Sequence, residues 1–380
     1  MKKILIVIGH YLPGYRSGGP QRTVENLCAA FEKRAEIYIL TLNRDFGIQE
    51  QYDVPTNIWL KRYGVNVMYV NEKDFGYRLF SAMFAQFENI YTCSLFARST
   101  YLNMIVNRSN NKGTHNFYVA PMGVFSKGAI EVKFIKKMSF LRLCSTFGLF
   151  DNVIWSFSSI DEFNDAKNVI GEKCIKKYVI AEDLPTKIDF ENSRRSLHTK
   201  EPGILKIVFM SRIVPKKNLQ FAVDCLNFAI EGSVIFDIYG TLEDEEYWHQ
   251  VQTKASALPA NVSVRYCGEL APEKVVGKLS NYDLFLFPTK GENFGHVIYE
   301  SLSAGCIPII SDQTPWNDLS EKECGRVVPL SDIKKYRTTI TEMMSMNGSD
   351  FRKMQLNAID YAEHKYIQSI KSSGYEKILL

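Results

Sequence analysis

Short runs of consecutive apolar residues alternate with amphipathic stretches along this chain of 380 residues. A strand that is buried on both faces of a parallel sheet reads as an unbroken apolar run, so this alternation predicts βα units. We expect strands at residues 4–8, 36–40, 117–120, 153–157, 204–210, 235–239, 262–266, 284–287 and 307–310. Apolar residues spaced three and four apart predict helices at residues 23–32, 219–229 and 296–304.

The polar segment ENSRRSLHTKEPG separates two series of strands. It covers residues 191–203 and has no apolar period, so we predict a loop there. The predicted fold class is α/β, with two Rossmann-like doubly wound domains at residues 1–185 and 200–358 that face a ligand-binding cleft. The charged, helical tail is expected to return to the first domain over residues 360–380.

Composition and charge exclude several classes of protein. Hydrophobic residues make up 46% and charged residues 23%, which is typical of a globular chain and not of a disordered one. The net charge of +4 is too small to indicate a nucleic-acid-binding domain, although it is compatible with an anionic ligand or an anionic membrane surface. The eight cysteines form no C-x-x-C pair, so we expect buried thiols in a reducing cytoplasm, with neither zinc nor disulfides.

The first apolar run, at residues 4–8, is too short for the core of a signal peptide, so we interpret it as the first strand. No stretch approaches ~18 uninterrupted apolar residues, so no membrane-spanning helix is expected.

The most informative segment is LFLFPTKGENFGHVIYESLSAGCIPII, residues 284–310, which reads as strand, loop, helix, turn and strand. Gly291 and Gly295 in the loop allow the backbone to approach a ligand closely. The N-terminus of the following helix is suited to an anion such as a diphosphate. Glu300 in this helix can accept hydrogen bonds from the two hydroxyls of a ribose, and Glu292 in the loop can face a sugar. The alternative is an ordinary helix with surface glutamates.

A second segment, VFMSRIVPKKNL, places two cations directly after a predicted strand. The guanidinium of Arg212 and the ammonium of Lys217 suit a departing diphosphate. We interpret the neighbouring Lys216 as a solvated charge.

These two segments resemble the signature of retaining glycosyltransferases of the GT-B fold, glycosyltransferase family four. The E-x7-E motif of that family matches Glu292 and Glu300, and its R-x4-K pair matches Arg212 and Lys217. The resemblance covers most of the chain and is densest over residues 206–329. It implies that Glu300 binds the nucleotide ribose and that Glu292 lies beside the transferred sugar. It also implies that backbone amides hold the sugar and the phosphates at Asn293, Phe294, Gly295 and His296.

Two further loops carry weaker parts of the resemblance. The segment PGYRSGGP matches a glycine-rich loop that approaches the sugar phosphate, which implies donor binding by Gly18 and Gly19, although a Gly-Gly loop also occurs without that function. Glu269 and Leu270 match a backbone clamp for the base, and the alternative is a plain turn.

One position departs from the family pattern. In VAPMG, Met122 stands where many family members have a histidine or an arginine. A methionine cannot donate the hydrogen bond usually made there, so the donor sugar cannot be named from the first domain.

The sequence therefore predicts a retaining glycosyltransferase with a nucleotide diphosphate sugar as co-substrate and no bound cofactor. It has no D-x-D motif, so we expect metal-independent transfer in which cations and a helix N-terminus stabilise the leaving diphosphate. We favour a UDP-linked hexose or N-acetylhexosamine, moved to a saccharide or a lipid-linked oligosaccharide in cell-surface polysaccharide or lipopolysaccharide synthesis. The alternatives are a non-catalytic nucleotide-sugar-binding protein or partner subunit, and another GT-B enzyme such as an epimerase or a phosphorylase.

Residues 127–150 combine apolar and basic positions. The apolar stripe consists of Ile130, Phe134, Met138 and Leu141, and the surrounding cations are Lys133, Lys136, Lys137 and Arg142. A basic amphipathic helix can lie on an anionic bilayer, and the alternative is an internal helix with a solvated basic side. Because family relatives often use lipid-linked acceptors, we expect a cytoplasmic protein with peripheral contact at the inner face of the membrane.

Overall fold

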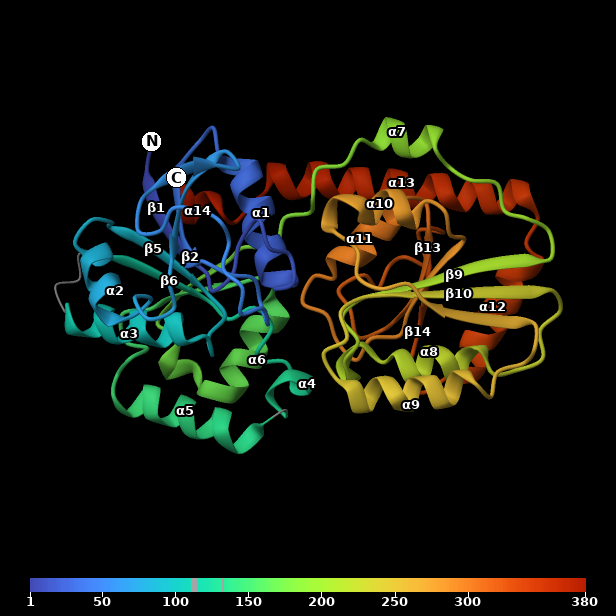
Figure 1. Cartoon of the computed structure of the whole chain (residues 1–380), viewed down its shortest axis with the longest axis horizontal. Helices are drawn as coiled ribbons and strands as arrows, with labels where there is room; N and C mark the ends of the chain where they lie inside the picture. The colour runs from blue at the N-terminus through green and yellow to red at the C-terminus, as the bar shows by residue number, and fades with distance from the viewer. Residues whose placement is uncertain (111–114, 132) are drawn as a thin grey trace. The chain divides into compact units, whose positions relative to one another are not determined.

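The computed structural model describes residues 1–110, 115–131 and 133–380 (Figure 1). It divides the chain into two compact units. The first unit is Met1–Leu184 with Ser369–Leu380, and the second is Pro185–Gln368.

The first unit is built on an eight-stranded sheet with the order β3-β4-β2-β1-β5-β6-β7-β8. β3 runs antiparallel to β4, and the other neighbouring pairs are parallel. The strands are β1 (Lys3–Val7), β2 (Glu36–Leu42), β3 (Leu60–Arg62), β4 (Val65–Val70), β5 (Asn89–Cys93), β6 (Asn116–Ala120), β7 (Ile154–Phe157) and β8 (Lys177–Ile180).

Helices cover both faces of this sheet, because successive side chains of β1 point to opposite faces. Ile4 and Ile6 pack with α1 and α14, whereas Leu5 and Val7 belong to the core that includes residues of α2, α3 and α5. The helices are α1 (Gly19–Phe31), α2 (Tyr77–Phe84), α3 (Arg98–Ser109), α4 (Lys127–Ile130), α5 (Phe134–Thr146), α6 (Ile160–Ile170) and α14 (Glu376–Leu379).

The second unit has an all-parallel six-stranded sheet with the order β11-β10-β9-β12-β13-β14. Counted along the chain this order is 3-2-1-4-5-6, the arrangement of a Rossmann domain. The strands are β9 (Ile204–Met210), β10 (Ser233–Tyr239), β11 (Val262–Tyr266), β12 (Leu284–Phe287), β13 (Ile307–Ser311) and β14 (Arg326–Val328).

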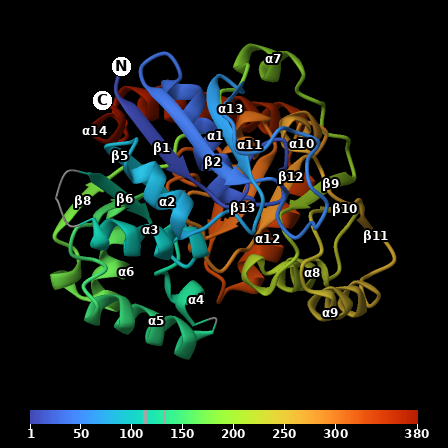
Figure 2. The same ribbon diagram turned by 60° about the vertical axis from the view of Figure 1, so that its left-hand side comes forward.

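Helices also lie on both faces of the second sheet. Both views show α8, α9 and α12 on one side and α10, α11 and α13 on the other (Figures 1 and 2). The helices of this unit are α7 (Phe190–Arg195), α8 (Leu219–Leu226), α9 (Glu245–Ala255), α10 (Val275–Leu279), α11 (His296–Ser303), α12 (Ile333–Ser345) and α13 (Gly348–Lys371).

Two details differ from the sequence-based prediction. The expected loop over residues 191–203 begins with helix α7, because Asp189 caps it by accepting a hydrogen bond from the amide of Asn192. The second unit is also longer than the predicted range of 200–358. Phe190 and Ala362 are both buried in its core, so residues 185–199 and 359–368 belong to it, and only residues 369–380 of the predicted tail belong to the first unit.

The eight cysteines all lie in the described part of the chain, and none of them forms a disulfide there. Burial raises the pKa of the Cys28 thiol to about 12, so this thiol is neutral at physiological pH. In the described ranges no helix is both long enough and apolar enough to cross a bilayer.

Candidate functional site

The strand order of the second unit decides where a ligand-binding crevice forms. β9 is flanked by β10 on one side and by β12 on the other, so the chain changes direction across the sheet at the β9–β12 pair. Ligands of doubly wound sheets bind beyond the carboxyl ends of the strands at this switch point. The loops that follow β9 and β12 contain the predicted cations and Glu292.

Hydrogen bonds to backbone carbonyls join these two loops. The amide of Lys290 donates to the carbonyl oxygen of Lys216 at 2.9 Å, and Asn218 Nδ2 donates to the carbonyl oxygen of Pro288 at 2.9 Å. The two loops therefore form one surface at the end of the sheet.

Lys217 and Glu292 meet on this surface. Lys217 Nζ donates to Glu292 Oε1 at 2.6 Å, and the side chains are only 15% and 11% exposed. The hydroxyl of Thr289 donates to the same carboxylate oxygen at 2.9 Å, and the ammonium lies 5.4 Å from the centre of the Phe287 ring. This is a largely buried ion pair, so removing either partner would leave an uncompensated charge.

Arg212, on the same loop, is held differently. Its Nη1 contacts both carboxylate oxygens of Glu243 at 3.2 Å, and its side chain is 43% exposed. Glu243 follows β10. The structure therefore pairs each of the two predicted cations with a carboxylate.

Helix α11 begins directly after the loop that contains Glu292. Gly295 is its N-cap with φ 82°, and a Cβ atom there would lie 2.8 Å from Ile298 Cδ1, so only glycine fits without strain. The short turn places the helix N-terminus at the carboxyl end of β12, where its partial positive charge can stabilise an anion. Glu300 lies in this helix and is 5% exposed.

The loop residues between Glu292 and α11 are well packed. Phe294 is 8% exposed, and its ring centre lies 4.8 Å from that of His296. Gly295 lies between Phe294 and His296 in the chain, and Asn293 directly precedes Phe294.

The loops after β10 and β11 complete this edge of the sheet. The amide of Gly240 donates to the carbonyl of Gly268 at 2.9 Å. A Cβ atom at Gly240 would lie 1.7 Å from the carbonyl oxygen of Ser211, so this close approach requires glycine. Glu269 and Leu270 follow Gly268 directly, and Leu270 packs on the core.

In the first unit, the predicted glycine-rich loop follows β1 and leads into α1. Gly18 is the N-cap with φ 71°, and Gly19 is the first residue of the helix. Asp45 orders the loop, because its buried carboxylate accepts hydrogen bonds from the amides of Tyr15 at 3.0 Å and Arg16 at 3.2 Å. Sequence reasoning missed Asp45, although a polar residue shortly after a buried strand was a usable signal.

Met122 adopts a left-handed backbone conformation with φ 63°. The next amide, of Gly123, donates to Glu162, whose carboxylate also accepts from the amide of Ser158 at 2.8 Å. Burial raises the pKa of Glu162, and these backbone hydrogen bonds oppose that shift. Glu162 thus fixes the loop that contains Met122.

The predicted amphipathic helix over residues 127–150 is two helices, α4 and α5, and Val132 between them lies outside the described residues. Ile130 and Leu141 are buried in the core of the first unit, and Met138 packs against that core. The predicted apolar stripe is therefore largely internal, because it faces the sheet.

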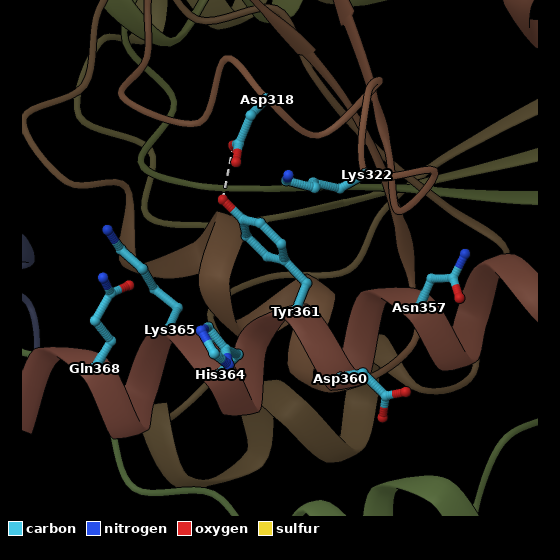
Figure 3. Close-up of a pocket in the computed structure, with 8 residues that line it drawn as sticks. All are labelled: Asp318, Lys322, Asn357, Asp360, Tyr361, His364, Lys365 and Gln368. Atoms are coloured by element: carbon cyan, nitrogen blue, oxygen red, sulfur yellow. Dashed lines mark hydrogen bonds between the residues drawn. The ribbon is translucent and has the colours of Figure 1, made fainter.

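A cavity of about 570 Å³ lies beside α13 in the second unit (Figure 3). Asp318, Tyr361 and Lys365 line it, and none of the described residues around it belongs to the predicted donor site. Across the described ranges, no three His, Cys, Asp or Glu side chains are grouped as a metal ion would require.

Residues 189–365 match the family model described as Glycosyl transferases group 1. The matched range covers most of the second unit and includes both predicted glutamates and both cations. This match supports a glycosyltransferase. No curated protein matches the chain significantly.

Solved structures are similar over nearly the whole chain. Anabaena Alr3699/HepE in complex with UDP and glucose has a TM-score of 0.69 at 13% identity, with 98% of each chain covered. Sucrose-phosphate synthase from Thermosynechococcus elongatus has a TM-score of 0.67 at 15% identity, covering 100% of this chain and 96% of that chain. WaaG, a glycosyltransferase involved in lipopolysaccharide biosynthesis, has a TM-score of 0.65 at 11% identity, covering 99% and 98%. At these identities the likeness shows the fold, and it confirms two Rossmann-like α/β domains of the GT-B type.

Proposed function

Taking the glycosyl transferases group 1 match of the second unit as the starting point, we propose that this protein transfers a sugar from a nucleotide diphosphate sugar with retention of anomeric configuration. The donor is a UDP-linked hexose or N-acetylhexosamine, and the acceptor is a saccharide or a lipid-linked oligosaccharide. The observation that carries the proposal is the Lys217–Glu292 pair at the switch point of the sheet, beside the N-terminus of α11.

In the proposed reaction, a bond forms between the acceptor oxygen and the anomeric carbon while the bond from that carbon to the diphosphate breaks. Lys217, Arg212 and the N-terminus of α11 stabilise the two negative charges that leave, without a metal ion. The leaving phosphate oxygen takes the proton of the acceptor hydroxyl on the same face of the sugar. Glu292 orients the sugar, and Glu300 accepts hydrogen bonds from the ribose hydroxyls.

A panel of nucleotide sugars, screened by thermal shift, tests the donor assignment. A ligand that binds only the native state raises the melting temperature, so UDP-sugars are expected to give the largest increase. Each donor that raises the melting temperature is then incubated with the enzyme, and the release of UDP is measured to detect transfer or slow hydrolysis. In Glu300→Ala we expect turnover to fall at least ~100-fold, because a group that binds the donor is lost.

The same experiment separates transfer from the alternative of a non-catalytic nucleotide-sugar-binding protein. Binding without hydrolysis or transfer for every donor would favour that alternative. Wild-type rates in Glu300→Ala would remove the assignment of the ribose site.

We also propose a peripheral contact between the first unit and an anionic membrane, at the outward face of α5. Four large apolar side chains of this segment are solvent-exposed: Phe134 (52%), Ile135 (79%), Leu143 (56%) and Phe147 (67%). The exposed cations beside them are Lys133, Lys136 and Arg142. Adjacent apolar and cationic groups match the chemistry of an anionic bilayer surface at the inner face of a cell membrane.

Flotation of the full-length protein with vesicles tests this contact. We expect binding to vesicles that contain phosphatidylglycerol at low salt, and several-fold weaker binding for the triple variant Ile135→Ser/Leu143→Ser/Phe147→Ser. The matched control replaces three exposed apolar residues elsewhere in the first unit: Ile58→Ser/Ile160→Ser/Tyr178→Ser. Equal binding of the two triple variants would contradict the proposal. It would also be contradicted if the wild type formed a dimer in solution and the α5 triple variant, but not the control, were a monomer.

A further inference from the structure

The last residue of β13 and the residues that follow it form hydrogen bonds with the loop after β12 at three successive points. Ser311 Oγ donates to the carbonyl oxygen of Thr289 at 2.5 Å, and the amide of Glu292 donates to the carbonyl oxygen of Gln313 at 3.1 Å. Trp316 Nε1 then donates to the carbonyl oxygen of Phe294. This loop, residues 288–295, is called the donor loop below, and it is bonded on both sides of Asn293.

Trp316 adds an aromatic contact to its hydrogen bond. Its side chain is 2% exposed, and its ring lies edge-on to Phe294 with the ring centres 5.3 Å apart. The Phe294 ring in turn contacts the ring of His296, the first residue of α11. One buried indole therefore fixes both the backbone and the side chain of Phe294.

Helix α13 supports the indole from the other side. The ring of Tyr361 lies 6.2 Å from that of Trp316, and its hydroxyl donates to Asp318 Oδ1 at 2.7 Å. Figure 3 shows this hydrogen bond across the cavity beside α13. Trp316 is therefore held between α13 and the donor loop, with little room to move.

The loop that Trp316 holds has intrinsic freedom at two positions. Gly291 and Gly295 lie in it, and both have positive φ angles, so an unsupported loop would sample many conformations. A site that stabilises developing charge works best when its groups are already in place.

We propose that Trp316 is a positioning residue for the donor loop, acting through the carbonyl group and ring of Phe294. This inference rests on the proposed donor site but assigns a function to a residue outside it. Trp316 fixes the backbone of Phe294 and, through it, the direction of the amides before α11. It does not touch the sugar or the phosphates.

Trp316→Phe tests the assignment, because it keeps an aromatic ring and removes the N–H group. We expect kcat to fall about tenfold, as displaced reacting groups do, while the affinity for UDP changes less than about twofold. The matched control, Tyr361→Phe, removes a hydroxyl from the same aromatic cluster that does not contact Phe294, and it should keep wild-type kcat. An equal loss of kcat in both variants would mean that Trp316 contributes only to the packing of the aromatic cluster, and it would overturn the proposal.

Hydrogen exchange of the ligand-free protein gives a second readout that does not require catalysis. Peptides covering residues 289–297 should exchange at least about tenfold faster in Trp316→Phe than in the wild type or in Tyr361→Phe, because the donor loop opens more often. Unchanged exchange in Trp316→Phe would overturn the proposal even in an active enzyme. If the wild type turns over no donor, the proposed function fails, and the exchange result still decides the function of Trp316.

Discussion

Two cations on one short loop are held in opposite ways. Lys217 is paired with Glu292 where both side chains are at most 15% exposed, whereas Arg212 is paired with Glu243 with 43% of its own side chain exposed. Removing one partner of a buried pair leaves an uncompensated charge and costs about 3–5 kcal/mol. An exposed pair contributes only about 0–1 kcal/mol, so its partners exchange easily.

The two cations differ in the carboxylate contact that a ligand must replace before it can bind them. In the proposed donor site, a diphosphate would replace Glu243 beside Arg212 at little cost, because the guanidinium is already partly solvated. To engage Lys217, the donor must give Glu292 a new partner, and the hydroxyls of the transferred sugar are suitable donors. In the proposed reaction, binding of the phosphates to Lys217 would therefore release Glu292 toward the sugar.

The largest expected effect follows substitution of the buried cation. In Lys217→Ala, turnover of the donor should fall at least ~100-fold, because charge stabilisation is lost and Glu292 is left without its cation. Steady-state kinetics with released UDP as the product measure this loss. The matched control is the adjacent Lys216→Ala, whose turnover should stay within about threefold of wild type. Only Lys217 has the R-x4-K spacing from Arg212, and only Lys217 pairs with Glu292. A control as impaired as Lys217→Ala would break the distinction between the two lysines.

The positions of the strands and loops that hold these two cations could be predicted from the sequence. The apolar runs of β9 and β12 have the predicted bounds, because a strand buried on both faces leaves an unbroken apolar pattern. Once those strands are placed, the loops after them must meet at the switch point. The sequence therefore placed Arg212 and Lys217 in the loop after β9, although it could not show that each is paired with a carboxylate.

Other features depend on contacts that leave no periodic pattern in the sequence. Trp316 and Glu243 reach their partners across loops from different strands, and no local spacing signals such a contact. Helix α7 was missed because its signal is the cap at Asp189 and not an apolar stripe. In α5, Met138 and Leu141 of the predicted stripe pack inward, whereas Phe134 of the same stripe is exposed, so hydropathy alone could not tell the two faces apart.

A smaller effect is expected at the exposed cation. In Arg212→Gln, kcat/KM should fall about tenfold, less than for Lys217, because a charge near solvent interacts through a higher effective dielectric. The loss should also shrink as salt rises, since exposed charges are screened within about 8 Å at physiological ionic strength. Kinetics at two salt concentrations measure both trends, with Arg195→Gln on α7 as an exposed-arginine control. A salt-independent loss as large as that of Lys217→Ala would show that the two pairs are equivalent.

The smallest effect, and the one of opposite sign, is expected at the carboxylate that competes for Arg212. Glu243→Gln keeps the shape of the side chain and removes its charge, so the affinity for UDP should rise about two- to fourfold, within the small contribution of an exposed pair. Calorimetric titration with UDP at low salt measures the change. Glu246→Gln, an exposed glutamate in the first turn of α9, controls for the general loss of one negative charge. Equal gains in both variants would assign the effect to net charge, and weaker UDP binding in Glu243→Gln would mean that Glu243 holds Arg212 in the orientation the diphosphate needs.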